Sequence, residues 1–156
     1  MKLDNDRLEV AFLRTADNPD LAVPAYSTAG ASGFDLRACI PDDRPLTLEP
    51  GCRVLIPIGF AIGLPAGYEM QVRPRSGLAA KHGITVLNSP GTIDWDYRGP
   101  VSICLVNLGA DSVDIHRGDR IAQGVVAEVR QATLFEVEAL DETVRGHGGF
   151  GSTGRA

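Results

Sequence analysis

The chain has 156 residues, of which 44% are hydrophobic, and this length and composition fit one compact domain with its own core. Its 20 acidic and 15 basic residues give a formal net charge of -5, which argues against general binding to nucleic acids or membranes. A small anionic ligand is still compatible with this charge, because such a site needs only a few local arginines and backbone amides.

The cysteines and the N-terminus indicate the cellular compartment in which the chain is expected. Cys39, Cys52 and Cys104 are odd in number and widely spaced, which favours reduced thiols over a disulfide or zinc site. The first residues lack the basic start and apolar run of a signal peptide, and no apolar stretch approaches the length of a membrane span. We therefore expect a cytoplasmic chain.

Frequent turns favour an all-β domain, since 18 glycines and 10 prolines interrupt the chain at short intervals. Hydrophobic patterning predicts strands, in chain order, at 8–13, 46–50, 53–64, 68–73, 92–98, 101–107, 113–115 and 133–140. The run at 53–64 is almost continuously apolar, which indicates burial on both faces. Pro57 in its middle predicts an edge or a bulge.

One short helix is predicted within 74–83, where Ser76 suits the N-cap and Gly83 the C-terminal stop. At barely two turns, this helix must be held by packing rather than by propensity. Its N-terminus presents backbone N–H groups beside the Arg75 guanidinium and the Ser76 hydroxyl, a combination typical of anion or phosphate sites. An ordinary cap with a surface arginine is the alternative.

Between chain breaks at 90–91 and 99–100, bulky and polar side chains alternate: Thr92, Ile93, Asp94, Trp95, Asp96, Tyr97 and Arg98. This period of two predicts a strand or hairpin arm with Asp94 and Asp96 on one face. Two neighbouring carboxylates perturb each other's protonation, which suits a general base or a metal site. A solvated hairpin arm with an acidic outer face is the alternative.

Two isolated polar residues have both a plain and a functional interpretation. Asp35 lies between two apolar residues, so it either stabilises a turn or faces a metal or ligand. Gln123 could donate its amide to a ligand oxygen, although a lone glutamine is usually a polar surface residue.

The character of the chain changes at residue 141, beyond which glycine is frequent and only one aromatic residue, Phe150, occurs. Such a segment cannot form a core element by itself. Arg145, Ser152 and Thr153 suit a polyphosphate, and Phe150 could stack on a ring. We expect a β-domain at 1–140 and a flexible C-terminal arm at 141–156 that closes over a ligand and excludes water.

In this order, five stretches of the chain resemble the motifs of the homotrimeric deoxyuridine triphosphate nucleotidohydrolases (dUTPases). These stretches are AGASGFDL at 29–36, PRSGLA at 74–79, GTIDWDYRG at 91–99, GDRIAQ at 118–123 and RGHGGFGSTG at 145–154. The resemblance implies an antiparallel, jelly-roll-like β-barrel with one short helix. It also implies a trimer whose active sites are shared between subunits.

The resemblance further implies hydrolysis of dUTP to dUMP and pyrophosphate by attack of water on the α-phosphorus, helped by Mg²⁺ on the triphosphate. This reaction keeps uracil out of DNA and supplies dUMP for thymidylate synthesis. Asp94 matches the general base of the family, and Asp35 matches the acidic residue that holds a water on the metal. Tyr97 matches the aromatic residue beneath the deoxyribose.

The remaining matches are substrate-binding residues. For the phosphates they are Arg75, Ser76, Gly77 and Gln123, and for uracil they are Asn88, Gly91, Thr92 and Ile93. On the arm they are Arg145, Phe150, Gly151, Ser152 and Thr153.

Trp95 departs from the family, in which this position is usually small. The alternation points Trp95 away from Asp94, so we expect it to pack against a neighbouring subunit or the root of the hairpin. Two other functions are alternatives to dUTP hydrolysis. A dCTP deaminase-like enzyme on the same fold would need a glutamate near the pyrimidine, and this hairpin has none. A catalytically silent nucleotide-binding regulator would not need Asp94, Asp35 and the arm together.

Overall fold

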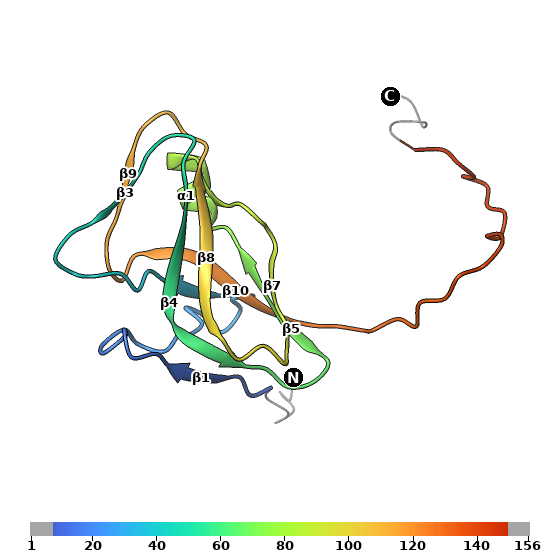
Figure 1. Ribbon diagram of the computed structural model, residues 1–156, viewed down its shortest axis with the longest axis horizontal. Coiled ribbons are helices and arrows are strands. Elements are labelled where there is room, and N and C mark those ends of the chain that lie inside the picture. The colour runs from blue at the N-terminus through green and yellow to red at the C-terminus, as the bar shows by residue number, and fades with distance from the viewer. Residues whose placement is uncertain (1–7, 150–156) are drawn as a thin grey trace.

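The computed structural model describes residues 8–149 as a β-body from which the C-terminal part of the chain runs away (Figure 1). The elements are β1 (Ala11–Arg14), β2 (Phe34–Arg37), β3 (Leu46–Leu48), β4 (Arg53–Gly63), β5 (Tyr68–Arg73), α1 (Ser76–His82), β6 (Ile84–Val86), β7 (Gly91–Ile93), β8 (Pro100–Asn107), β9 (Val113–Ile115) and β10 (Arg120–Glu128). Within these described residues, α1 is the only helix, and it is not long and apolar enough to cross a membrane.

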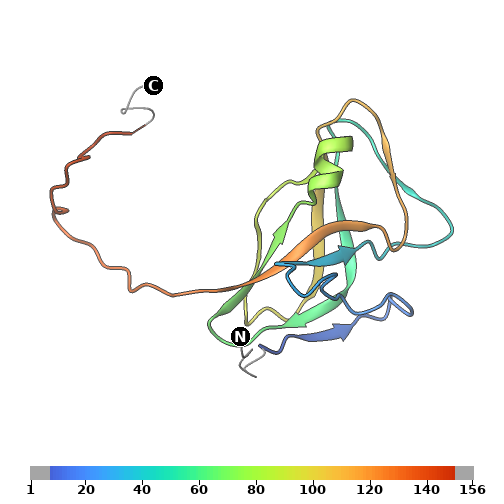
Figure 2. The ribbon, with the colours of Figure 1, turned by 180° about the vertical axis from the view of Figure 1, so that it is seen from behind.

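The core lies between two four-stranded antiparallel sheets. One sheet has the strand order β1-β4-β8-β6 and the other β2-β10-β5-β7, while β3 and β9 form a separate pair. One hydrophobic cluster joins inward-facing residues of both sheets, such as Leu36 and Met70 from one and Ile56 and Leu105 from the other. Figure 1 shows β4 and β8 side by side with β10 crossing behind them, and Figure 2 shows the same crossing from behind.

The long strand β4 follows from the apolar run in the sequence. Its second half is buried on both faces, as that run predicts, whereas Leu55 near its start is 65% exposed. The register of β4 against β8 shifts between Pro57 and Ala61, which is the irregularity that Pro57 predicts.

Gly59 lies inside this irregular stretch with a φ of 78°, a conformation that side chains with a Cβ rarely adopt. The fully buried Asn18 packs against it and donates its side-chain amide to the Gly59 carbonyl oxygen at 3.1 Å. A Cβ at position 59 would lie 2.6 Å from the Asn18 side chain. The bulge and the loop that follows β1 are therefore fitted to each other.

Five predicted strands lie where the structure has them. β5 coincides with 68–73 and β9 with 113–115, while β3, β4 and β8 differ from 46–50, 53–64 and 101–107 by one or two end residues. The helix ends at Gly83 as predicted, with Gly83 left-handed at a φ of 68°. The prediction that Ser76 is its N-cap is wrong. Arg75 is the N-cap, without a side-chain capping bond, and Ser76 begins the helix.

The predicted strand at 92–98 is wrong beyond Ile93, where β7 ends. The chain turns at once, and the Tyr97 amide donates to the Asp94 carbonyl oxygen at 3.1 Å. The Arg98 guanidinium fixes this turn by donating to the carbonyl oxygens of Trp95 at 2.6 Å and Tyr97 at 2.9 Å. Asp94 and Asp96 therefore do not share the face of a strand, because local turn bonds replace strand pairing here.

The predicted strand at 133–140 is also wrong in the described chain. Regular structure ends with β10 at Glu128, and Leu134 and Phe135 beyond it are 90% and 79% exposed. An apolar alternation is not enough to form a strand, since its backbone groups need a neighbouring strand to pair with.

We predict that Gly59→Ala destabilises the protein more than Gly51→Ala does. Both glycines have positive φ values, 78° and 75°, but a Cβ at Gly51 meets open space. Gly51→Ala should lower the free energy of unfolding by about 1–2 kcal/mol through backbone strain alone. Gly59→Ala should lower it by about 2–5 kcal/mol, because its Cβ also displaces Asn18. Urea unfolding at one protein concentration measures both, and equal losses would contradict the proposed fit.

Candidate active site

A polar cavity of about 280 Å³ collects most of the residues predicted to hold phosphates. Its walls are Ser27, Gly33, Asp35, Arg75, Ser76, Gly77, Arg120 and Gln123. These residues come from β2 and the loop before it, the start of α1 and the start of β10, which are distant in sequence. The fold thus brings together the predicted Asp35, the helix start at 75–77 and Gln123.

Strand pairing explains why Asp35 and Gln123 meet, since these two residues are partners in the β2–β10 register. The Gln123 amide donates to the Pro74 carbonyl oxygen at 3.0 Å and so ties β10 to the segment before α1. Gly33 has to be small here, because a Cβ would lie 2.9 Å from the Gln123 side-chain oxygen and 3.0 Å from the Gly124 carbonyl oxygen.

Two arginines face one carboxylate in this cavity, which we call the arginine cavity. Arg75 Nε lies 3.0 Å from one Asp35 oxygen, and Arg120 Nη1 lies 3.3 Å from the other. Arg75 also donates from Nη1 to the Arg120 carbonyl oxygen at 2.9 Å. Two cations against one anion leave the arginine cavity with a net positive charge, which suits an anionic ligand.

Arg120 is a residue of this cavity that sequence reasoning missed. It lies three positions before Gln123, directly after a turn, where a charged residue is ordinarily solvated. The available signal was its place in the stretch GDRIAQ beside Gln123, but local pattern does not indicate which face of β10 it takes. The register shift of β10 against β2 between Arg120 and Ala122 decides this.

A second cavity, of about 320 Å³, is built around the turn after β7, and we call it the hairpin cavity. It is lined by Leu55, Thr92, Ile93, Asp94, Tyr97, Pro100, Val101 and Ser102. The Tyr97 hydroxyl donates to the Pro100 carbonyl oxygen at 3.1 Å, and a Cβ at Gly99 would collide with the Tyr97 ring and hydroxyl. The aromatic ring is therefore fixed against the backbone, with the exposed Asp94 carboxylate beside it.

Asn88 and Gly91, also predicted to bind substrate, lie next to each other at the entry to this hairpin. A Cβ at Gly91 would lie 3.3 Å from the Asn88 amide nitrogen and 3.2 Å from Val72. Gly91 is buried, and its lack of a side chain allows the Asn88 amide to approach the backbone.

The two cavities share no lining residue, so one chain does not unite all the predicted site residues. Arg145 lines neither cavity. It is exposed on the C-terminal arm, where its Nε donates to the Gly148 carbonyl oxygen at 2.8 Å, and the arm lies away from the β-body (Figure 2). Phe150, Gly151, Ser152 and Thr153 lie outside the described residues.

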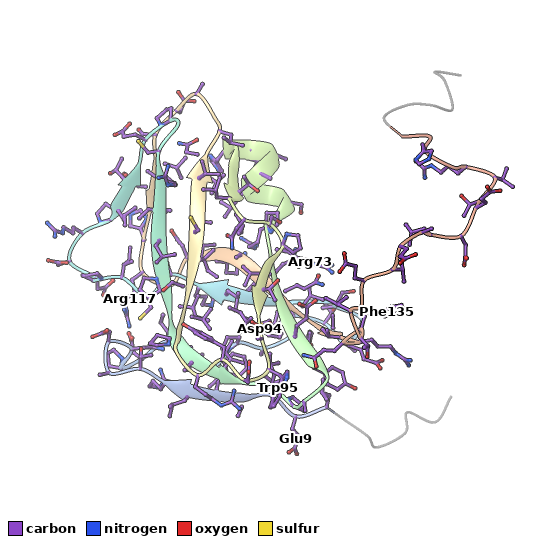
Figure 3. All side chains as sticks on the ribbon, turned by 45° about the vertical axis from the view of Figure 1, so that its right-hand side comes forward. Glu9, Arg73, Asp94, Trp95, Arg117 and Phe135 are labelled. Atoms are coloured by element: carbon purple, nitrogen blue, oxygen red, sulfur yellow. The ribbon has the colours of Figure 1, made fainter. Side chains whose placement is uncertain are left out.

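Trp95 does not line either of these cavities. It lines a third hollow, together with Asp94, and is 41% exposed. The alternation on which the expected direction of Trp95 rests ends with β7 at Ile93, and packing of Trp95 against a neighbouring subunit or the root of the hairpin stays a prediction. Figure 3 labels Asp94 and Trp95 on the loop that precedes β8.

The described residues contain no group of three or more His, Cys, Asp and Glu side chains that could hold a metal ion by themselves. In the arginine cavity Asp35 is the one acidic residue, and both its oxygens face arginines. Such a carboxylate fits a Mg²⁺ ion that arrives on a polyphosphate and keeps its waters, because Mg²⁺ typically takes few protein ligands in that case.

Comparison with known proteins shows the family to which the chain is similar. A family model described as dUTPase matches residues 20–154. The deoxyuridine 5'-triphosphate nucleotidohydrolase of Caulobacter vibrioides (strain NA1000 / CB15N) is 61% identical over 147 residues, which cover 94% of this chain and 95% of that protein.

Two solved phage proteins have the same fold. A mutant of the Staphylococcus bacteriophage 80alpha dUTPase with dUpNHpp superposes with a TM-score of 0.80 at 24% identity, covering 96% of this chain and 99% of that one. A mutant of the DUTPase from phage phi11 of S. aureus, which coordinates a structural Mg(II) ion, superposes with a TM-score of 0.73 at 21% identity. The alignment with the phi11 protein covers 88% of this chain and 100% of the phi11 chain.

These likenesses confirm the expected antiparallel jelly-roll fold with one short helix. They favour neither the deaminase nor the silent-regulator alternative. Because the family model spans residues 20–154 and the Caulobacter relative is 61% identical over 94% of the chain, the chain belongs to the dUTPase family, enzymes that hydrolyse dUTP.

Proposed function

We propose that the chain acts as a homotrimer that hydrolyses dUTP to dUMP and pyrophosphate with Mg²⁺, and that Asp94 is the general base. The observation that carries this proposal is the position of Asp94, an exposed carboxylate on the wall of the hairpin cavity beside the fixed ring of Tyr97. A carboxylate at that position can take a proton from a water that attacks phosphorus, while the cavity holds the base and sugar.

The hairpin cavity supports selection for uracil and deoxyribose. Asn88 and the backbone of β7 offer hydrogen bonds to the edge of the base, and a base with the opposite polarity would leave one of these groups unpaired. Tyr97 would lie beneath the sugar. Its hydroxyl is bound to Pro100 and its ring lies against Gly99, and a ring held there beneath the sugar would leave no space for a 2′-hydroxyl.

The arginine cavity supports binding of the triphosphate. Arg75 and Arg120 supply positive charge, Ser76 and Gly77 present a hydroxyl and backbone amides, and Gln123 adds a side-chain amide. When bound with the triphosphate, Mg²⁺ would neutralise charge on the phosphates, and Asp35 would accept a hydrogen bond from a water on the metal. The protein's own contribution is to hold the phosphates in line with the attacking water.

A trimer would unite cavities that one chain keeps apart. In a threefold assembly, the arginine cavity of one subunit can meet the hairpin cavity of the next, and the arm of a neighbour can close over both. We further propose that residues 141–156 form this closing arm, with Arg145, Ser152 and Thr153 at the outer phosphates and Phe150 and Gly151 at the base. The exposed Arg145 and the position of the described part of the arm away from its own body support this.

The cell's nucleotide pool is the setting that we propose for this reaction. All three cysteines are free thiols, and Cys52 is exposed, which fits the reducing cytoplasm. There the enzyme would keep uracil out of DNA and supply dUMP for thymidylate synthesis.

The substrate range separates the candidate functions. With Mg²⁺ and each of dUTP, dCTP, dTTP and UTP, we expect pyrophosphate release from dUTP at least about 100-fold faster than from the others. Pyrophosphate and ammonia should be followed in parallel. Ammonia from dCTP would assign the chain to the deaminases, and binding of dUTP without either product would indicate a regulator.

We predict that Asp94→Asn lowers kcat about 10²–10⁴-fold, the range typical of a lost general base, while dUpNHpp still binds. The matched control is Asp96→Asn, because Asp96 is a neighbouring carboxylate in the same turn that lines neither cavity. It should keep nearly full turnover. Nearly normal hydrolysis by Asp94→Asn would show that another group takes the proton.

Deleting residues 145–156 should leave a folded trimer that has lost most of its activity, because the outer phosphates lose Arg145 and water enters the site. Gel filtration and circular dichroism check the assembly, and pyrophosphate release measures turnover. A deleted enzyme as active as the full chain would rule out a closing arm.

A further inference from the structure

The only tryptophan of the chain has no part in the reaction described above, although it follows Asp94 directly. Trp95 lines a hollow of about 290 Å³ whose walls include Gly67, Tyr68, Asp94, Val129 and Gln131. The hollow therefore joins three features: the turn that carries Asp94, the turn between β4 and β5, and the first residues after β10.

This hollow is where the chain leaves the β-body. The Val129 amide donates to the Gly67 carbonyl oxygen at 2.8 Å, directly after β10 ends. In the described stretch beyond Gln131, the hydrogen bonds lie within the stretch itself, such as those from the Gly146 amide to the Thr143 carbonyl and from the Gly148 amide to the Arg145 carbonyl. The direction of the chain toward the arm is thus set at Val129–Gln131, opposite Trp95.

The indole of Trp95 is well placed to control that direction. It is partly buried in the hollow, and its remaining surface, at 41% exposure, can be covered by the departing chain. A tryptophan offers a large, rigid contact surface with few torsions to fix. Its backbone is held by the Arg98 guanidinium, which donates to the Trp95 carbonyl oxygen at 2.6 Å, and the same turn fixes Asp94.

We propose that Trp95 is a positioning residue that fixes the path of residues 129–131 and so holds the C-terminal arm in the orientation from which it closes. This inference rests on the proposed closure of the arm over the active site. Without the indole, the departing chain samples more directions, and a smaller fraction of arms is ready to close. The apparent affinity for dUTP then falls by that fraction, whereas saturating dUTP still draws the arm closed.

The fluorescence of Trp95 gives a direct test, because no other tryptophan contributes to the signal. The probe is dUpNHpp with Mg²⁺, added to the full-length trimer and to the variant lacking 145–156. We expect a shift in emission in the full-length protein and little or none in the deleted one. An equal shift in both would mean that the nucleotide acts on Trp95 directly, and no shift in the full chain would mean that closure does not reach it. Either result overturns the proposal.

Kinetics provide the second test. Trp95→Ser should lower kcat/KM about tenfold, mostly through a higher KM, and Trp95→Phe should restore most of the loss. In the chain lacking 145–156, Trp95→Ser should have no further effect on the residual activity. If Trp95 had a purely structural role, Trp95→Ser would lower activity by the same factor in the full-length chain and in the chain lacking 145–156, and it would reduce Tm. If Trp95→Ser does not fold, Val129→Ser removes the opposite wall of the hollow and should raise KM in the same arm-dependent way.

These outcomes are separable from failure of the proposed function. A wild-type chain that releases no pyrophosphate from dUTP refutes the proposed reaction, and full activity after deletion of 145–156 refutes arm closure. An unchanged KM in Trp95→Ser, with the wild type active and the deleted chain reduced to a small residual activity, refutes only the role of Trp95.

Discussion

The short link between β7 and β8 is the constraint on which the candidate site depends. These strands belong to different sheets, so residues 94–99 must carry the chain from one sheet to the other at the edge of the core. They do so in a tight turn, which is held by the bond from the Tyr97 amide to the Asp94 carbonyl and by Arg98. The proposed base, Asp94, thus lies on a loop that begins in one sheet and ends in the other. This is a rigid position for a loop residue.

The same layering explains why the site is divided. The second sheet presents Asp35 and Gln123 from paired strands beside the start of α1, whereas the hairpin cavity also takes Leu55 and Ser102 from the first sheet. Each cavity is complete as a local structure, but each offers only part of what a nucleoside triphosphate needs. Symmetric association is an economical way to combine such halves, because every subunit contributes both.

Much of the fold could be predicted from the sequence, since burial on one face of a strand leaves a period of two in sequences such as 68–73. The same period of two predicts a strand at 94–98, and this is wrong. There the bulky residues belong to a turn and contact different neighbours, although their spacing is that of a strand. The period of two is misleading again at 133–140, because a strand also needs a partner that the local sequence does not reveal. The grouping of Asp35 with Gln123 came from family resemblance, and Arg120 was missed because a register shift sets its face.

The paired arginines around Asp35 also bear on how an acidic protein attracts a polyanion. At long range the chain's charge of -5 repels the substrate, but at physiological salt such repulsion decays within about 8 Å. Inside that distance the substrate meets two guanidinium groups that Asp35 already holds side by side, so their mutual repulsion is offset before any ligand arrives. The phosphates therefore bind to guanidinium groups that are already in place before binding. Moderate salt should hinder the approach of the substrate less than it would for a basic protein.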